Sequence, residues 1–308
     1  MWPSAAALEH FMRMNGRAAE RLEFSPTPSE DVRMRFTIRH ETVYRYSAPV
    51  SLSPHLLRLN PRAEGATILE RSLTVNPKPI AFREETDRFG NRVTHLDFEG
   101  FFDRLRIESR FDLETVAPEP FAGLGAPPLP WSGGPDDPMA QYRSGEAQEP
   151  AVREFASALA SESRWQVLLF LDRLNRTLFA RMRHEIRAEG AAWSPERTLV
   201  AGGGACRDVT ALFMAACRSL GIAARFVSGY QAEADTPDGR RHLHAWPEAF
   251  LPGVGWRGFD PTHGLAVTDG HVALCAAPDQ AATMPIEGGF YGDGVASTLE
   301  YDVQIATG

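Results

Sequence analysis

Cysteine is scarce in this chain, which has only three among its 308 residues. Three cysteines cannot all pair with one another. Cys206 and Cys217 stand in what the pattern predicts to be one helix, so about 16 Å separates them along the helix axis. Because a disulfide needs its two Cα atoms within about 7 Å, we expect free thiols, a reducing compartment and a cytoplasmic location.

Long apolar runs and an excess of positive charge are also missing. No apolar stretch approaches the ~20 residues that a bilayer-spanning helix needs, and the N-terminal segment does not combine a basic start with an apolar stretch. The net charge of −8 argues against nucleic acid, since phosphates are bound by clustered lysines and arginines. We therefore expect neither a membrane nor a nucleic acid as a partner.

The length suits two domains, and a hydrophobic content of 43% supplies a core without metal or disulfide. Residues 1–33 have no clear period, so we interpret them as a leader, either disordered or ahead of the true start. Residues 34–116 alternate polar with apolar side chains between turn sequences, which predicts an antiparallel β-sandwich. The predicted strands begin at Met34 and continue as Leu56–Asn60, Glu70–Val75, Arg92–Leu96 and Arg104–Thr115.

Residues 117–150 are rich in Pro, Gly, Asp and Ser, a composition typical of a linker. Residues 151–308 begin with helical periodicity and continue with short strands, so the chain is predicted to be α+β. The expected elements of this second domain are a helix near 152–159, a helix at Val167–Phe179, a helix from Cys206 to Gly221, and strands at Ala224–Tyr230, Leu243–Leu251 and Trp256–Asp260.

The sequence Gly202-Gly203-Gly204-Ala205-Cys206 places a thiol in the first turn of a predicted helix. Unpaired N–H groups and the helix dipole favour the thiolate there, and the glycines would let a substrate backbone approach. The alternative is a small buried residue that opens a core helix. Cys217 lies on the apolar stripe of the same helix and is interpreted as core.

A thiolate nucleophile needs a base, and the base needs an orienting group. His242 and His244 would share one face of the strand that follows, so spacing alone leaves both open. A short hairpin then brings Asp260 alongside that strand. Each residue also has a plain interpretation, because strand histidines are usually structural and an Asp before Pro is a common turn former.

Several stretches together resemble the bacterial transglutaminase-like superfamily. In the second domain they are Gly204-Ala205-Cys206-Arg207-Asp208, Ser219–Tyr230, His244-Ala245-Trp246 and Gly255–Thr262. In the first domain they are Arg39–Tyr46, Leu57–Arg62 and Asp87–Asn91, which resemble the N-terminal β domain that accompanies this core.

The resemblance implies a papain-like core with helices packed on an antiparallel sheet or barrel. It implies Cys206 as nucleophile, His244 as general base and Asp260 as the group that orients His244. His184 stands where relatives usually carry a tyrosine and is a candidate oxyanion donor. The remaining candidates for the substrate cleft are Asp208, His242 and Trp246, although Asp208 is also explained as a favourable first-turn charge.

The resemblance favours a hydrolase, a cysteine peptidase or amidase, acting on a protein or peptide substrate. The alternatives are a transglutaminase-type acyltransferase and a catalytically inactive relative that binds peptide or glycan. A zinc site made by His242 and His244 with His263 or Cys206 is a further alternative. No paired zinc motif and no Asp-x-Asp-x-Asp-Gly calcium loop supports a metal, so we expect no cofactor.

Overall fold

The first long strand, β1 (Arg33–Leu52), alternates exposed and buried side chains, and Phe36 and Ile38 point into the core. We obtained this structure as a computed structural model that describes residues 33–308, apart from 118–125, 135, 145–148, 188–189, 233–235 and 237. Residues 1–32 of the predicted leader lie outside the described residues, as does part of the predicted linker, whereas Arg33, the last residue of that leader, begins β1. Residues 33–308 form a single unit.

Two antiparallel sheets make up the N-terminal domain. Its strands after β1 are β2 (His55–Leu57), β3 (Ala66–Asn76), β4 (Ala81–Thr86), β5 (Arg92–Asp97) and β6 (Phe102–Val116). One sheet has the order β15-β1-β6-β3 with β16 paired to β1, where β15 is Phe290–Tyr291 and β16 is Ser297–Thr307. The other has the order β14-β2-β5-β4, where β14 is Ile286–Glu287. Both sheets contribute side chains to one hydrophobic cluster, including Ile38, Leu57, Leu96 and Ile107. This arrangement is the predicted sandwich.

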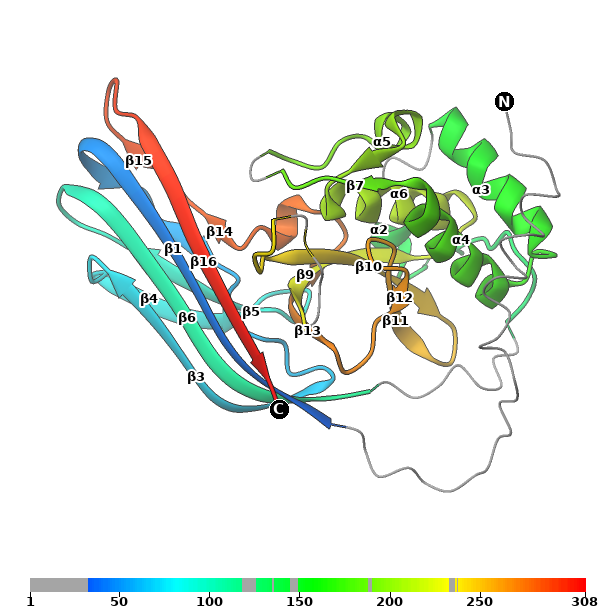
Figure 1. Cartoon of the computed structure of the whole chain (residues 1–308), viewed down its shortest axis with the longest axis horizontal. Coiled ribbons are helices and arrows are strands. Elements are labelled where there is room, and N and C mark those ends of the chain that lie inside the picture. The colour runs from blue at the N-terminus through cyan, green and yellow to red at the C-terminus, as the bar shows by residue number, and fades with distance from the viewer. Residues whose placement is uncertain are drawn as a thin grey trace. The chain divides into compact units, whose positions relative to one another are not determined.

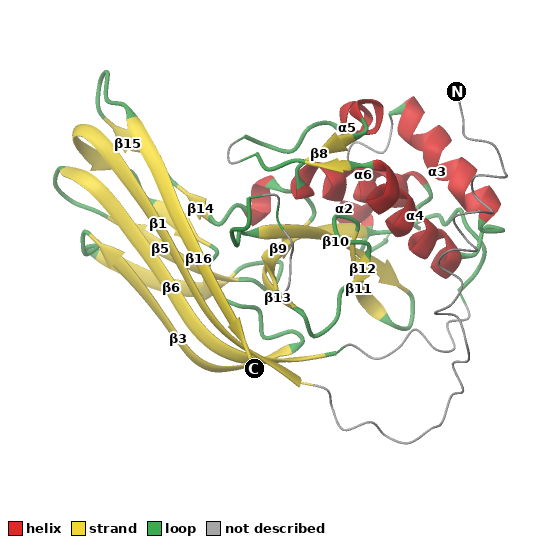
Figure 2. Cartoon of the chain, in the orientation of Figure 1, coloured by secondary structure: helices red, strands yellow, loops and turns green. Residues whose placement is uncertain are grey.

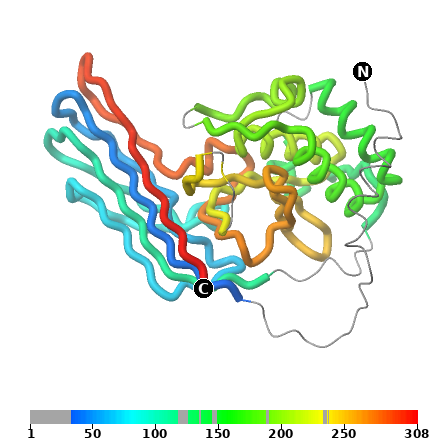
Figure 3. The backbone as a smooth tube through the Cα atoms, in the orientation of Figure 1, coloured from blue at the N-terminus to red at the C-terminus, as the bar shows by residue number. Residues whose placement is uncertain are grey.

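The last strands of the chain complete this sandwich. They are β14 (Ile286–Glu287), β15 (Phe290–Tyr291) and β16 (Ser297–Thr307), and β16 pairs with β1 from Phe36↔Thr307 to Tyr46↔Ser297. Figures 1 and 3 show the red C-terminal strand running beside the blue N-terminal one. The sequence division had placed these residues in the second domain. Pairing across more than two hundred residues leaves no trace in local periodicity.

The second domain packs helices against an antiparallel sheet of order β12-β11-β10-β9-β13. The helices, red in Figure 2, are α2 (Ala140–Arg143), α3 (Pro150–Glu162), α4 (Val167–Arg181), α5 (Pro195–Ala201) and α6 (Cys206–Ser219), with a 3₁₀ turn, η2 (Ala281–Thr283). The strands of the sheet are β9 (Ala224–Gln231), β10 (His244–Leu251), β11 (Gly255–Asp260), β12 (Leu265–Ala266) and β13 (His271–Ala277). Two short strands, β7 (Arg183–His184) and β8 (Gly203–Gly204), pair in parallel. The α+β class is thus confirmed.

Helix α6 lies at the centre of this domain. Its buried face includes Val209, Leu212, Phe213 and Ala216, as the apolar stripe predicted, and packs into the main hydrophobic cluster with α3, α4 and β10. Gly221 follows the helix at φ +76°, and a Cβ there would lie 1.8 Å from a backbone oxygen. Among the helices of the described residues, none has the length and apolar character needed to cross a bilayer.

The two domains share a core. Tyr230 and Val272 of the second domain belong to the hydrophobic cluster of the sandwich. The Asn91 side chain exchanges two hydrogen bonds with the backbone of Ala276, at 2.8 and 3.0 Å. His40 of β1 and the Tyr230 hydroxyl, both buried, lie 2.7 Å apart and share a hydrogen bond. Strand β1 is therefore anchored directly to β9, beside the strand that carries His244.

Candidate functional site

The start of α6 is fixed by a buried carboxylate. Asp208 is 0% exposed and accepts hydrogen bonds from the backbone N–H of Ala205 and of Trp193, both at 2.7 Å. Arg187 donates two further bonds to the same carboxylate, at 2.6 and 2.8 Å. A Cβ on Gly204 would lie 2.9 Å from that of Asp208. The glycine therefore makes room for the protein's own carboxylate, whereas the sequence interpretation reserved this space for substrate.

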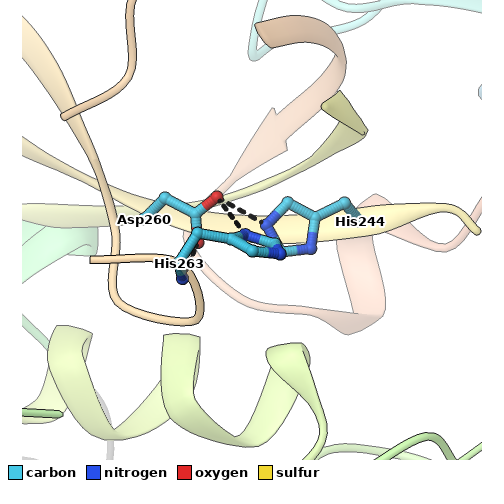
Figure 4. Close-up of side chains that lie close together, drawn as sticks. All are labelled: His244, Asp260 and His263. Atoms are coloured by element: carbon cyan, nitrogen blue, oxygen red, sulfur yellow. Dashed lines mark hydrogen bonds and ion pairs between the residues drawn. The ribbon is translucent and has the colours of Figure 1, made fainter. Parts of the chain in front are cut away.

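Cys206, His244 and Asp260 come together from α6, β10 and the end of β11. The His244 side chain interacts with the Cys206 thiol and lowers its pKa. His244 Nε2 lies 2.9 Å from Asp260 Oδ2 (Figure 4). Because Nε2 faces the carboxylate, Nδ1 is the ring nitrogen left for the thiol. The three side chains thus form the chain of contacts expected of a nucleophile, a base and an orienting group.

The charges of these groups are coupled. Burial opposes ionisation of Cys206, but the hydrogen bond and charge of His244 prevail, so the pKa of the thiol is lowered. Burial likewise opposes protonation of His244, but Asp260 and then Cys206 raise the pKa of the imidazole. Burial opposes the Asp260 anion too, yet His244 and two further imidazoles hold the pKa of Asp260 well below its usual value. A thiolate–imidazolium pair is favoured.

The carboxylate of Asp260 is contacted by three histidine side chains. Besides His244, His263 Nδ1 lies 2.9 Å and His271 Nε2 lies 3.2 Å from the same Oδ2 atom. The other oxygen, Oδ1, accepts the backbone N–H groups of Thr262 and His263 at 3.1 and 3.2 Å. A fully buried carboxylate is costly unless such donors surround it. The turn after β11 and strand β13 therefore serve to keep this anion charged.

The proton positions on these rings follow from what each nitrogen faces. Nε2 of His263 and Nδ1 of His271 are buried and have no hydrogen-bond partner among the described residues. An unpaired buried N–H costs more than an unpaired lone pair on a ring, so the proton sits on the nitrogen that faces Asp260. Burial lowers the pKa of His271, which agrees with a neutral donor.

A cavity of about 410 Å³ opens over the thiol. Cys206, His244, His263 and His184 line it, together with residues of β1 and β16. His184 comes from β7, which pairs with Gly204 just before the nucleophile helix. Burial lowers the pKa of His184, and the neighbouring His263 lowers it further, so its ring is a neutral N–H donor at neutral pH. The position that the sequence singled out thus shares the cavity with the thiol.

Comparison with known proteins assigns both regions of this chain to a family. The sequence profile described as the bacterial transglutaminase-like N-terminal region matches residues 36–114, and that of the transglutaminase-like superfamily matches residues 154–261. Together the two matches cover more than half of the chain. The chain belongs to the transglutaminase-like superfamily. Cys206, His244 and Asp260 of this chain all lie within residues 154–261, which match the superfamily core.

A solved structure and curated sequences are also similar to this chain. A crystal structure from Cytophaga hutchinsonii, described as a candidate cysteine protease, superposes with a TM-score of 0.68. It is 21% identical and covers 90% of this chain and 91% of its own, so it shows the fold. Uncharacterized proteins of Mycobacterium tuberculosis and Mycobacterium leprae are 26% and 27% identical over 88% of this chain. The matched region covers 92% of the Mycobacterium tuberculosis protein and 98% of the Mycobacterium leprae protein.

The last two cleft candidates of this transglutaminase-like protein differ in position: His242 lines the cavity, whereas Trp246 does not. Strand β10 begins at His244, so the period-two argument does not reach His242, which instead bonds the Tyr301 hydroxyl and Asp238. Trp246 is 1% exposed and packs against Val227, away from the cavity lining. Residues two apart on a strand share a face, which would place Trp246 beside His244 at the cavity. The ring of Trp246 is instead needed to fill the space in the core that Gly229 leaves.

The structure also tests the zinc alternative against geometry. His244, Asp260 and His263 each place one possible ligand atom within 4.8 Å of the others. One ring nitrogen of His244 and one of His263 lie at hydrogen-bond distance from the same carboxylate oxygen of Asp260, so hydrogen bonding accounts for the cluster. His242, which the zinc alternative required, is engaged by Tyr301 and Asp238. Sequence reasoning missed His271; its only signal was a histidine eleven residues after Asp260.

Proposed function

We propose that this transglutaminase-like protein is an enzyme that attacks amide or peptide carbonyls through Cys206. The observation that carries the proposal is the line of contacts from the Cys206 thiol through His244 to the buried Asp260, at the floor of a cavity. A thiol, a base and an orienting carboxylate in this order are the parts that acyl transfer requires.

The first half of the reaction forms an acyl-enzyme. The Cys206 thiolate adds to the carbonyl carbon, and His244 gives its Nδ1 proton to the leaving amine as the C–N bond breaks. The backbone N–H of Cys206, which lies in the first turn of α6, has no intrahelical acceptor and is proposed as one oxyanion donor. The neutral imidazole of His184 is proposed as the second. Asp260 keeps the His244 ring in the orientation needed for this proton transfer and for the one in the second half of the reaction.

The second half releases the acyl group. In hydrolysis, His244 takes a proton from water, whose oxygen attacks the thioester and displaces the Cys206 thiolate. We propose hydrolysis of a peptide or amide as the main reaction. An amine in place of water would give the transglutaminase-type product through the same residues.

Product masses separate these reactions. We expect the wild type, incubated with a mixed peptide library and an excess of a primary amine, to convert a subset of peptides. Peptide-bond hydrolysis splits a peptide and adds one water, deamidation exchanges an amide NH₂ for OH, and amine transfer adds the amine with loss of ammonia. Samples in which iodoacetamide has alkylated Cys206 serve as the control. A library left unchanged by the wild type would contradict an enzymatic role.

The two histidines near the cavity should separate in activity. We expect His244→Ala to lower turnover by a factor on the order of 10⁴, since it removes the base. His242→Ala should cost less than about tenfold, because His242 acts through its contact with Tyr301 and not on the thiol. Tyr301→Phe is the matched control that removes the same hydrogen bond. Equal losses of turnover in His242→Ala and His244→Ala would contradict the assignment of His244 as the base.

A further inference from the structure

One wall of the cavity is made by the sandwich. On β1, Thr42 and Tyr44 point to the same face, and their partners across the ladder on β16 are Tyr301 and Leu299. All four side chains line the cavity that contains Cys206. The two strands thus present a small patch of adjacent side chains toward the thiol, although neither strand belongs to the domain that carries it.

Large apolar side chains are exposed inside this cavity. Leu299 is 42% exposed and Tyr301 38%, and on other parts of the lining Ile186 is 41% and Met284 39% exposed. Four such side chains gathered around one hollow differ from single apolar residues scattered over a surface. Ligand sites in proteins are typically concave and lined by apolar and aromatic groups with a few placed polar groups. This description fits the cavity.

Carboxylates are rare among the described residues that line the cavity. Glu185 is the one acidic residue of that set, and it forms an ion pair with Arg183 at 3.1 Å. Asp208, beneath the thiol, is fully buried and bonded to Arg187. The lining therefore offers little to attract a cationic side chain. Three arginines also line the cavity, Arg187, Arg207 and Arg241, and each already has an interaction partner in the protein. A bulky apolar side chain would cover surface that is otherwise exposed to water.

The wall is also held in place. The Tyr301 hydroxyl and His242 Nδ1 lie 2.8 Å apart and share a hydrogen bond. His242 Nε2 in turn lies 2.9 Å from Asp238. The ring of Tyr301 is therefore tethered to the segment that leads directly into His244. A side chain seated on this wall would lie at a defined distance from the reacting thiol, which is what specificity requires.

We propose that the β1–β16 wall selects substrates with an aliphatic or aromatic side chain close to the amide that Cys206 attacks. Leu299 and Tyr301 are the specificity-determining residues of one side, and Ile186 and Met284 line other parts of the same pocket. The inference rests on the proposed function, because it names the substrate class of the same site.

Peptidyl chloromethyl ketones test this directly, since the Cys206 thiolate displaces chloride from the ketone without any knowledge of the natural substrate. Reagents would carry Leu, Glu or Lys at either of the two residues before the ketone. We expect the wild type to be inactivated at least about tenfold faster by the best Leu reagent than by its Glu or Lys counterpart. Leu299→Asp should abolish this preference and raise the rate for Lys.

Two controls keep the outcomes apart. Leu69→Asp introduces the same charge at a 48% exposed leucine of β3 outside the cavity lining and should leave the preference unchanged. Iodoacetamide, too small to reach the wall, should alkylate Cys206 equally fast in all proteins. If Leu299→Asp fails to fold, Leu299→Ser replaces it, with the same loss of preference expected.

The possible failures are distinct. Equal rates for the Leu, Glu and Lys reagents in the wild type, or an unchanged preference in Leu299→Asp, would overturn the substrate class while leaving Cys206 as nucleophile. Failure of iodoacetamide and of every ketone to modify Cys206 ahead of Cys217 and Cys275 would overturn the proposed function, and this inference with it.

Discussion

Cys206→Ala should fold as the wild type does and lose turnover by a factor on the order of 10⁴ or more. The loss follows because no other thiol is placed to attack: burial raises the pKa of Cys217, and it raises the pKa of Cys275 to about 12. The fold should persist because the start of α6 is fixed by the Asp208 carboxylate and not by the thiol. Turnover of the library peptides and thermal unfolding measure the two effects.

Cys217→Ala is the matched control. Cys217 is fully buried in the main hydrophobic cluster, so removal of its sulfur should lower the free energy of unfolding by about 1 kcal/mol. Turnover per folded molecule should stay unchanged. Cys206→Ala would then lose turnover and keep its stability, whereas Cys217→Ala would lose stability and keep its turnover. Turnover retained by Cys206→Ala with the same product masses would exclude Cys206 as the nucleophile.

Asp260→Asn should narrow the pH range over which the enzyme turns over. The lowered pKa of Cys206 sets the acidic limb of the profile, and the raised pKa of His244 sets the basic limb. Without the carboxylate charge the pKa of His244 falls, so the basic limb moves to lower pH. The thiolate then loses support from a charged imidazole, so the pKa of Cys206 rises and the acidic limb moves to higher pH.

Alkylation of Cys206 by iodoacetamide, followed against pH, reads the thiolate population directly. Turnover of Asp260→Asn at neutral pH should fall by a factor on the order of 10³ to 10⁴. The substitution also lowers stability, because an amide has one acceptor oxygen where the carboxylate uses both, one for imidazoles and one for backbone N–H groups. A simple free-thiol titration near pH 8.5, equal in wild type and variant, would disprove the ion pair.

Much of the fold could be predicted because its signals are local. The alternation of β1, the apolar stripe of α6 and the Pro-Gly turn between β10 and β11 each follow from a few neighbouring residues. The predicted helix from Cys206 and the strand at Ala224–Tyr230 agree with α6 and β9 within a residue or two. The coming together of Cys206, His244 and Asp260 could be expected as well, once the family resemblance had selected His244 over His242.

What could not be predicted depends on distant parts of the chain. Nothing near residue 300 indicates that β16 pairs with β1, so the wall of the cavity was invisible in the sequence. The placement of His271 depends on the pairing of β13 with β9, which turns its ring toward Asp260. Trp246 shows the reverse error, since a residue that carries a family motif was assigned to the cleft although the core needs its volume.

The pairing of β1 with β16 also sets the order in which the site can form during synthesis. Strand β1 has β6 as a partner early, but its other edge stays open until residues 297–307 have been made. A nascent chain that already contains Cys206, His244 and Asp260 therefore still lacks the wall that seats the substrate. Such long-range pairing is slow to form, so thiol reactivity should precede substrate selectivity during folding.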